Sequence, residues 1–234
     1  KVAAATATAG LIIFYSCLTI MQNNYWKEPL FFYERTLRFA PDSPSININL
    51  AALYNDMGKR TEAIALLNKI IRIDPAYVKA YDNLAGIYYN AGEKEKAINL
   101  YEKALKIDPT YMNAYFNLGK IYNAIDKKEK AIEIFKKMLK INPKYAVAYN
   151  LLGLIYRDVE DDKVAITFFE KAIEVEPYFD ETYYNLGASY ANIGDKEKAI
   201  EAYETATKIN PGYADAYYDV ATLYNDIGKR EMAI

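Results

Sequence analysis

The chain has no histidine and a single cysteine, Cys17, among its 234 residues. Histidine is the commonest general base and the commonest metal ligand, so its absence removes the usual basis for acid–base or metal chemistry. One cysteine can form neither an intrachain disulfide nor a cysteine zinc cluster. We therefore expect a protein that is not an enzyme and that has no catalytic residue, cofactor or metal site.

A basic excess is also lacking. The chain has 29 Lys and Arg residues against 31 Asp and Glu residues, a net charge of −2. Nucleic-acid-binding domains usually carry a clear positive excess, because they neutralise phosphates. We expect no nucleic-acid partner.

The chain is instead rich in tyrosine, and its prolines are regularly spaced. There are 24 tyrosines. Prolines recur with a period of 34 residues, at Pro41, Pro75, Pro109, Pro143, Pro177 and Pro211. A fixed period of this length predicts an array of repeats. In this register the repeats start at Gly10, Pro44, Val78, Met112, Ala146, Asp180 and Ala214.

Within each repeat, two sets of positions predict two helices. Positions 4, 7, 8 and 11 lie on one face of a first helix, and positions 20, 24 and 27 lie on one face of a second helix. Ala or Gly at positions 8 and 20 leaves room for two helix backbones to approach. Gly58, Gly92, Gly194 and Gly228 predict the turn between the helices, because glycine adopts a positive φ at little cost. The periodic proline ends the second helix.

The recurring residues closely resemble the tetratricopeptide repeat family. One copy of the motif consists of Tyr81, Leu84, Ala85, Tyr88, Ala97, Tyr101, Ala104 and Pro109. The resemblance implies an all-α fold, a right-handed superhelical solenoid of 34-residue helix–turn–helix repeats. We predict that residues 44–234 form the array, with full repeats starting at 44, 78, 112, 146 and 180 and a truncated one at 214. Because the last repeat stops inside its second helix, we expect the natural protein to continue.

Residues 1–24 are predicted to form an apolar helix. Residues 2–21 contain no charged side chain and are long enough, at about 1.5 Å per residue, to cross a bilayer core. A membrane span is the favoured interpretation. A secretory signal segment and a buried first helix of a degenerate repeat are the alternatives. Residues 25–43 would then form the second helix of that degenerate repeat.

An apolar helix, then a Trp-led amphipathic helix, then repeats also resembles the C-terminal part of polytopic membrane glycosyltransferase-like proteins. Trp26, Tyr33, Leu37 and Pro41 carry this second resemblance. It implies a membrane-tethered array outside the cytoplasm, with the catalytic part absent from this chain. Without the membrane span, we expect a cytoplasmic protein.

The family resemblance implies that the first helices line a concave groove that holds a ligand. Position 6 is Asn in four repeats, and a ladder of amides can bind an extended peptide backbone. These Asn residues could instead support their own helices, and Phe116 and Tyr184 could simply pack between neighbouring first helices. The predicted peptide- or partner-binding residues are Asn49, Asn83, Asn117, Asn185, Lys79, Asp82, Tyr89, Phe116, Lys120, Asn150, Arg157, Tyr184 and Tyr218.

Acidic residues outnumber basic ones on this predicted surface, and the basic pairs with which some family members bind a terminal carboxylate are absent. We therefore expect a neutral to basic, extended protein or peptide ligand. The predicted function is a non-catalytic protein–protein interaction scaffold. The alternatives are a regulatory or substrate-presenting part of a membrane glycosyltransferase, and a structural array that self-associates through its ends.

Overall fold

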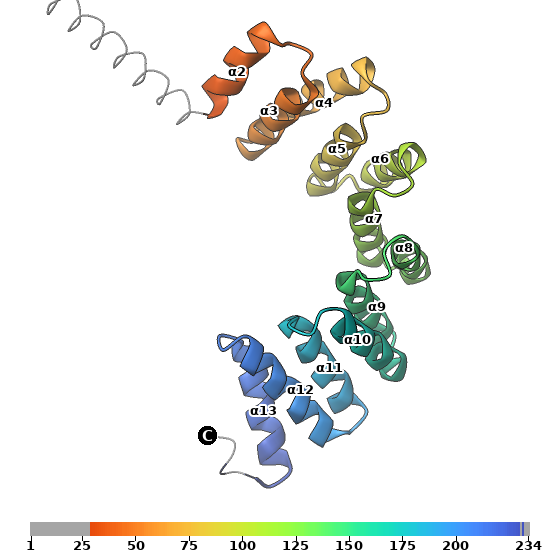
Figure 1. Ribbon diagram of the computed structural model, residues 1–234, viewed down its shortest axis with the longest axis vertical. Helices are drawn as coiled ribbons and strands as arrows, with labels where there is room; N and C mark the ends of the chain where they lie inside the picture. The colour runs from red at the N-terminus through yellow and green to blue at the C-terminus, as the bar shows by residue number, and fades with distance from the viewer. Residues whose placement is uncertain (1–28, 230, 232–234) are drawn as a thin grey trace, which may run out of the picture. The chain divides into compact units, whose positions relative to one another are not determined.

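The computed structural model describes residues 29–229 and 231, and every regular element among them except the single 3₁₀ residue 231 is an α-helix (Figure 1). The helices are α2 (Pro29–Phe39), α3 (Pro44–Asp56), α4 (Arg60–Ile73), α5 (Val78–Asn90), α6 (Lys94–Ile107), α7 (Met112–Ala124), α8 (Lys128–Ile141), α9 (Ala146–Asp158), α10 (Asp162–Val175), α11 (Asp180–Asn192), α12 (Lys196–Ile209) and α13 (Ala214–Asp226). The predicted all-α fold of tandem helix–turn–helix repeats is confirmed.

The helices pack as consecutive pairs, each made of one first helix and one second helix. The pairs are α3 with α4, α5 with α6, α7 with α8, α9 with α10, and α11 with α12 (Figure 1). The first helices α3, α5, α7, α9, α11 and α13 begin at Pro44, Val78, Met112, Ala146, Asp180 and Ala214, where the 34-residue units start. α13 packs against α12, and α2 packs against α3.

The chain divides into two compact units between Pro109 and Thr110. Helices α2 to α6 belong to the first unit, and helices α7 to α13 belong to the second. In both units, a tyrosine of a first helix bonds to a glutamate of the preceding second helix. The Tyr54 hydroxyl donates to Glu34 at 3.0 Å in the first unit, and the Tyr190 hydroxyl donates to Glu170 at 3.1 Å in the second.

The turn inside each pair requires a left-handed residue. Gly58, Gly92, Gly194 and Gly228 have φ between 75° and 85°, as the sequence predicts. In two repeats the same position is not glycine, and Asp126 and Glu160 adopt φ of 57° and 61°. A side chain in this region is strained, because Cβ comes close to the following carbonyl oxygen.

The second helices end where the periodic proline follows. Asp74, Asp108, Asn142 and Asn210 cap these helices in an extended conformation immediately before a proline. The proline ring disfavours the α conformation at the residue before it, so the helix stops there.

Small residues and aromatic rings form the core of each pair. The alanines at position 20 of the repeat, from Ala63 to Ala199, are fully buried. In three repeats, position 8 of the first helix is a glycine. An aromatic ring at position 24 of the second helix fills the space that a side chain there would need. These pairs are Gly119 with Phe135, Gly153 with Phe169, and Gly187 with Tyr203. The predicted close approach of the two helices is therefore present.

The predictions for residues 1–24, including the membrane span over 2–21, lie outside the described residues. Within the described part of the chain, no helix combines the length and the apolar character needed to cross a bilayer. Of the segment 25–43, the structure describes α2, which begins at Pro29 and ends at Phe39.

Candidate partner-binding surface

In the second unit, buried side-chain hydrogen bonds join the first helices α9 and α11. Nη1 of Arg157 donates to Oδ1 of Asn185 at 3.1 Å, and Nδ2 of Asn185 donates to Oδ1 of Asn150 at 3.2 Å. Asn185 is 5% exposed and Asn150 is 3% exposed. The amides of Asn185 and Asn150 therefore hydrogen-bond to each other across the interface between α9 and α11. A buried amide without a partner there would lower the stability of the fold.

A second polar contact joins α11 to α13. The hydroxyl of Tyr184 on α11 interacts with the nearby carboxylate of Asp219 on α13. Burial first, and then this interaction with Asp219, raise the pKa of Tyr184, while the positive charge of Arg157 lowers it. Arg157 and Asp219 thus act on the same hydroxyl, so the contacts of α9, α11 and α13 form one continuous polar row. We call Asn150, Arg157, Tyr184, Asn185 and Asp219 the polar row.

Two aromatic rings pack against Tyr184 of this row. The Tyr184 ring stacks on Tyr213 with centroids 4.9 Å apart and also contacts Tyr203 at 5.3 Å. Burial raises the pKa of Tyr203, and burial together with nearby acidic residues raises the pKa of Tyr213 to about 12. All three hydroxyls are therefore neutral donors at physiological pH. The ring cluster holds the Tyr184 hydroxyl in a defined position.

The predicted asparagine ladder is not uniform. In the first unit, Asn49 is exposed on α3, whereas Nδ2 of Asn83 donates to the Lys79 carbonyl oxygen at 2.8 Å within α5. In the second unit, Asn117 is half-buried on α7 and Asn185 is buried in the polar row. The same residue type at the same repeat position thus has different partners, and ligand contact by these amides stays a prediction.

The other predicted residues fall into two groups. In the first unit, Lys79 is exposed, Asp82 is half-buried and Tyr89 is 36% exposed, all on α5. In the second unit, Nζ of Lys120 lies 5.2 Å from the ring centroid of Phe116, one turn away on α7. Tyr218 on α13 is 73% exposed.

Tyr203 and Tyr213, which pack against Tyr184, are not predicted from the sequence as site residues. Tyr203 is a position-24 core residue and Tyr213 is the last residue of its repeat, and nothing in their spacing indicates that three rings meet. The polar row consists of hydrogen-bonding groups. It offers a guanidinium, amides, a phenol and a carboxylate, and no group of three potential metal ligands occurs in the described part of the chain.

Comparison with known proteins gives consistent matches. Models described as tetratricopeptide repeat match residues 44–77, 113–145, 146–179 and 181–213, and a model described as TPR repeat matches residues 86–126. No curated protein sequence matches the chain significantly.

Among solved structures, that of MamA protein is 33% identical, with a TM-score of 0.60, over 67% of this chain and 85% of that chain. The structure of YrrB, described as a TPR protein with an unusual peptide-binding site, is 27% identical, with a TM-score of 0.58, over 72% of this chain and 87% of that chain. PilF of Pseudomonas aeruginosa, 20% identical with a TM-score of 0.69 over 81% of this chain and 86% of that chain, shares the fold.

Proposed function

The chain belongs to the tetratricopeptide repeat family, and on that premise we propose that it is a non-catalytic scaffold that holds an extended segment of a partner protein. The proposed contact surface is the first-helix side of the second unit, from α7 to α13. The single observation that carries this proposal is the polar row, in which α9, α11 and α13 present hydrogen-bonding groups in succession.

The polar row suits a polypeptide backbone. Arg157 is half-buried, and its bond to Asn185 uses one of the five N–H donors of a guanidinium. The Asp219 carboxylate has several acceptor positions and lies near the Tyr184 hydroxyl. A donor at one end of the row and an acceptor at the other can bind a carbonyl oxygen and an N–H group of one extended segment. Each such bond contributes about 0.5–1.5 kcal/mol net.

Exposed aromatic side chains would supply most of the affinity. Tyr218 is 73% exposed on α13, and the half-buried Phe116 carries the Lys120 ammonium over its ring on α7. Tyrosine and other large residues dominate the binding energy of protein interfaces when a partner buries them. The description of YrrB as a peptide-binding repeat protein, at 27% identity, supports the same type of ligand here.

The charge of this surface favours a neutral to basic partner. The first turns of α11 and α13 carry Asp180, Glu181 and Asp215, and Asp219 belongs to the polar row. These carboxylates would repel an acidic segment and attract a basic one, which mainly affects the rate of association and the choice of partner.

Membrane attachment is a separate part of the proposal. Residues 2–21 contain no charged side chain, and we propose that they tether the array to a bilayer, with the repeats outside the cytoplasm. Retention of the full chain in the membrane pellet after alkaline carbonate extraction supports this. Release of the chain into the supernatant contradicts the tether and leaves the scaffold function untouched.

The scaffold function is tested by a matched pair of tyrosines. A peptide that binds the full chain is first selected from a displayed library of random extended peptides. Its affinity is then measured by calorimetry for Tyr218→Ala and for Tyr178→Ala. Tyr178 is 80% exposed, lies between α10 and α11 and is not a member of the polar row. We expect Tyr218→Ala to weaken binding about tenfold, the loss of roughly 1.4 kcal/mol typical of a contact aromatic, and Tyr178→Ala to leave it unchanged.

Equal affinities for both variants would place the ligand elsewhere and contradict the proposed surface. A charge-reversed version of the selected peptide provides the second control. It should bind more weakly than the original, and more so at low ionic strength.

A further inference from the structure

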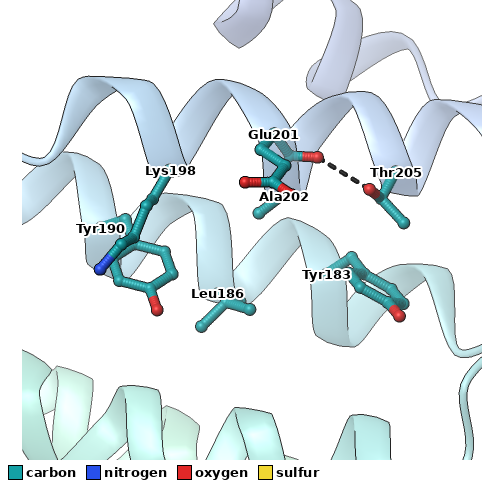
Figure 2. Close-up of a pocket in the computed structure, with 7 residues that line it drawn as sticks. All are labelled: Tyr183, Leu186, Tyr190, Lys198, Glu201, Ala202 and Thr205. Atoms are coloured by element: carbon teal, nitrogen blue, oxygen red, sulfur yellow. Dashed lines mark hydrogen bonds between the residues drawn. The ribbon is translucent and has the colours of Figure 1, made fainter.

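An open hollow marks the helix pair α11–α12 (Figure 2). Its volume is about 320 Å³. α11 contributes Tyr183, Leu186 and Tyr190, and α12 contributes Lys198, Glu201, Ala202 and Thr205. The lining is thus aromatic and aliphatic, with charged groups beside it. None of these residues belongs to the polar row, although α11 contributes to both.

Two small residues create the hollow. At position 23 of the repeat, Ala202 stands where the other repeats have large apolar side chains, namely Leu66, Leu100, Ile134 and Phe168. At position 26, Thr205 stands where the other repeats have Lys69, Lys103, Lys137 and Lys171. This repeat therefore departs from the common pattern at two positions one turn apart on the same helix, and both departures remove side-chain volume from the same place.

The preceding repeat shows which groups occupy the equivalent space. There, the Phe168 ring stacks on Tyr156, with centroids 5.3 Å apart and planes 9° from parallel. Nζ of Lys171 lies 5.8 Å from the centroid of the same Phe168 ring. A tyrosine, a second ring and a cation thus lie in sequence. Stacked rings and a cation over a ring are each favourable contacts beyond the burial of the rings themselves.

The repeat with the hollow keeps only the first of these three groups. Tyr190 corresponds to Tyr156, but Ala202 and Thr205 replace the second ring and the cation. Two contacts fix the orientation of Tyr190: its hydroxyl donates to Glu170 at 3.1 Å, and the Lys198 ammonium lies over the ring, 5.1 Å from its centroid. The hollow therefore lies against a tyrosine whose orientation is already set.

The charge around Tyr190 is negative. Burial, the hydrogen bond to Glu170 and the nearby charges of Glu170, Asp195 and Glu201 together raise the pKa of its hydroxyl to about 12. The one cation at this position, Lys198, is paired with Asp195 at 3.3 Å. An incoming positive charge is therefore attracted to the hollow, and an incoming negative charge is repelled.

We propose that this hollow binds an aromatic side chain of a partner polypeptide that has a lysine or arginine next to it. The partner's ring stacks on Tyr190 as Phe168 stacks on Tyr156, and its cation takes the place that Lys171 has in the preceding repeat. This is a second recognition site, independent of the first-helix surface proposed above, and it gives the scaffold a sequence preference that contacts to a peptide backbone do not provide.

Three blocked dipeptides test the chemistry of the occupant, with the full chain observed by NMR. The probes are Ac-Phe-Lys-NH2, Ac-Phe-Glu-NH2 and Ac-Ala-Lys-NH2. We expect Ac-Phe-Lys-NH2 to shift the Ala202 methyl and Tyr190 ring signals saturably, and Ac-Phe-Glu-NH2 to bind about two- to fivefold more weakly, as an exposed charge pair predicts. Ac-Ala-Lys-NH2 should leave both signals in place. Equal shifts from the Ala and Phe probes would overturn the proposal.

Filling the hollow from within provides the second test. Ala202→Phe, alone or with Thr205→Lys, recreates the arrangement of the preceding repeat. We expect both variants to remain helical by circular dichroism, to melt at a higher temperature than the parent chain and to lose binding of Ac-Phe-Lys-NH2. Ala65→Phe, at an exposed position of α4 in the first unit, is the matched control and should bind the probe normally. Persistent binding by Ala202→Phe would overturn the proposal, and Ala202→Leu provides the same test should the larger ring impair folding.

A second copy of the chain is the competing occupant. Phe39 is 81% exposed and follows Arg38 at the end of α2, so the chain itself carries an aromatic residue beside a cation. Sedimentation of the parent chain and of Phe39→Ala distinguishes the two sources. A monomer at all concentrations supports a separate partner. Self-association that disappears in both Phe39→Ala and Ala202→Phe would overturn that assignment in favour of a second copy.

Discussion

A Cβ atom placed on Gly119 of α7 would lie 2.5 Å from Cε1 of Phe135 on α8. That distance is too short for a Cβ atom, so in this repeat the Phe135 ring fills the space that a side chain at position 119 would need. The repeat starting at Pro44 combines Ala51 with the smaller Leu67, and the repeat starting at Val78 combines Ala85 with Tyr101. The ring at position 24 therefore lies against the position-8 glycine in the repeats that have one.

We predict that Gly119→Ala destabilises the chain although alanine favours helices. Overpacking a core costs about 1–3 kcal/mol, while replacing a helical glycine gains about 1 kcal/mol, so a net loss of up to about 2 kcal/mol is expected. Urea denaturation measures this loss. Gly86→Ala on α5 is the control, because nothing lies within 4 Å of a Cβ at that position, and it should stabilise instead. Adding Phe135→Leu to Gly119→Ala recreates the Ala51–Leu67 pair and should cost less than the sum of the two single changes.

The strained turn residue Glu160 gives a second prediction. Its φ of 61° lies in the left-handed region that Gly194 occupies in the equivalent turn with a φ of 85°. Glu160→Gly should raise the urea midpoint by the equivalent of about 1 kcal/mol, because glycine adopts this conformation without strain. The reciprocal change Gly194→Glu should lower it by a similar amount. Changes of the same sign in both variants would show that backbone strain does not govern this turn.

Asn185 and Asn83 occupy the same repeat position and give a third prediction. Asn185→Ala removes the partner of both Asn150 and Arg157 at a buried interface, so we expect a loss of about 1–3 kcal/mol. Asn83 is half-buried and bonds only to a carbonyl oxygen of its own helix, and Asn83→Ala should change the free energy of unfolding by less than about 0.5 kcal/mol. Thermal or urea unfolding of the two variants measures the difference. Equal losses would mean that position 6 has one structural role throughout the array.

Tyrosine ionisation gives a fourth prediction, for alkaline pH. The pKa of Tyr190 and that of Tyr213 are each raised to about 12 in the folded chain, chiefly by burial, against 10.0 in the absence of the fold. The folded state therefore holds these protons more tightly than the unfolded state. Their contribution is fully present below pH 10 and is lost as the pH rises from 10 to 12. We expect the melting temperature to fall across this range.

Tyr190→Phe tests that assignment. The variant has no hydroxyl to ionise, so its melting temperature should fall less steeply between pH 10 and 12 than that of the parent chain. Tyr178→Phe changes a tyrosine that is 80% exposed and serves as the control, with a slope like that of the parent. A Tyr190→Phe slope identical to the parent slope would show that the alkaline loss arises from other groups.

The 34-residue spacing of the prolines, the small residues at positions 8 and 20 and the turn glycines predicted paired helices, and the structure has them. These features depend on short-range physics. A proline stops the helix before it, a glycine allows a left-handed turn, and small side chains at helical spacing let a neighbouring helix approach. Each of these rules acts within one repeat, so the same sequence signal occurs several times along the chain.

The properties of individual site residues required the tertiary structure. Position 6 is asparagine in four repeats, yet Asn185 is buried against Asn150 while Asn83 bonds to its own helix, because the residue that meets each amide comes from another helix. The sequence indicates the hollow beside Ala202, since the aligned repeats show smaller side chains at positions 23 and 26 of this repeat. Whether that volume stays open depends on neighbouring side chains from α11 and α12. The sequence alone thus determined the repeat, through local rules, whereas packing between helices decided which of its residues are buried, paired or left facing an open space.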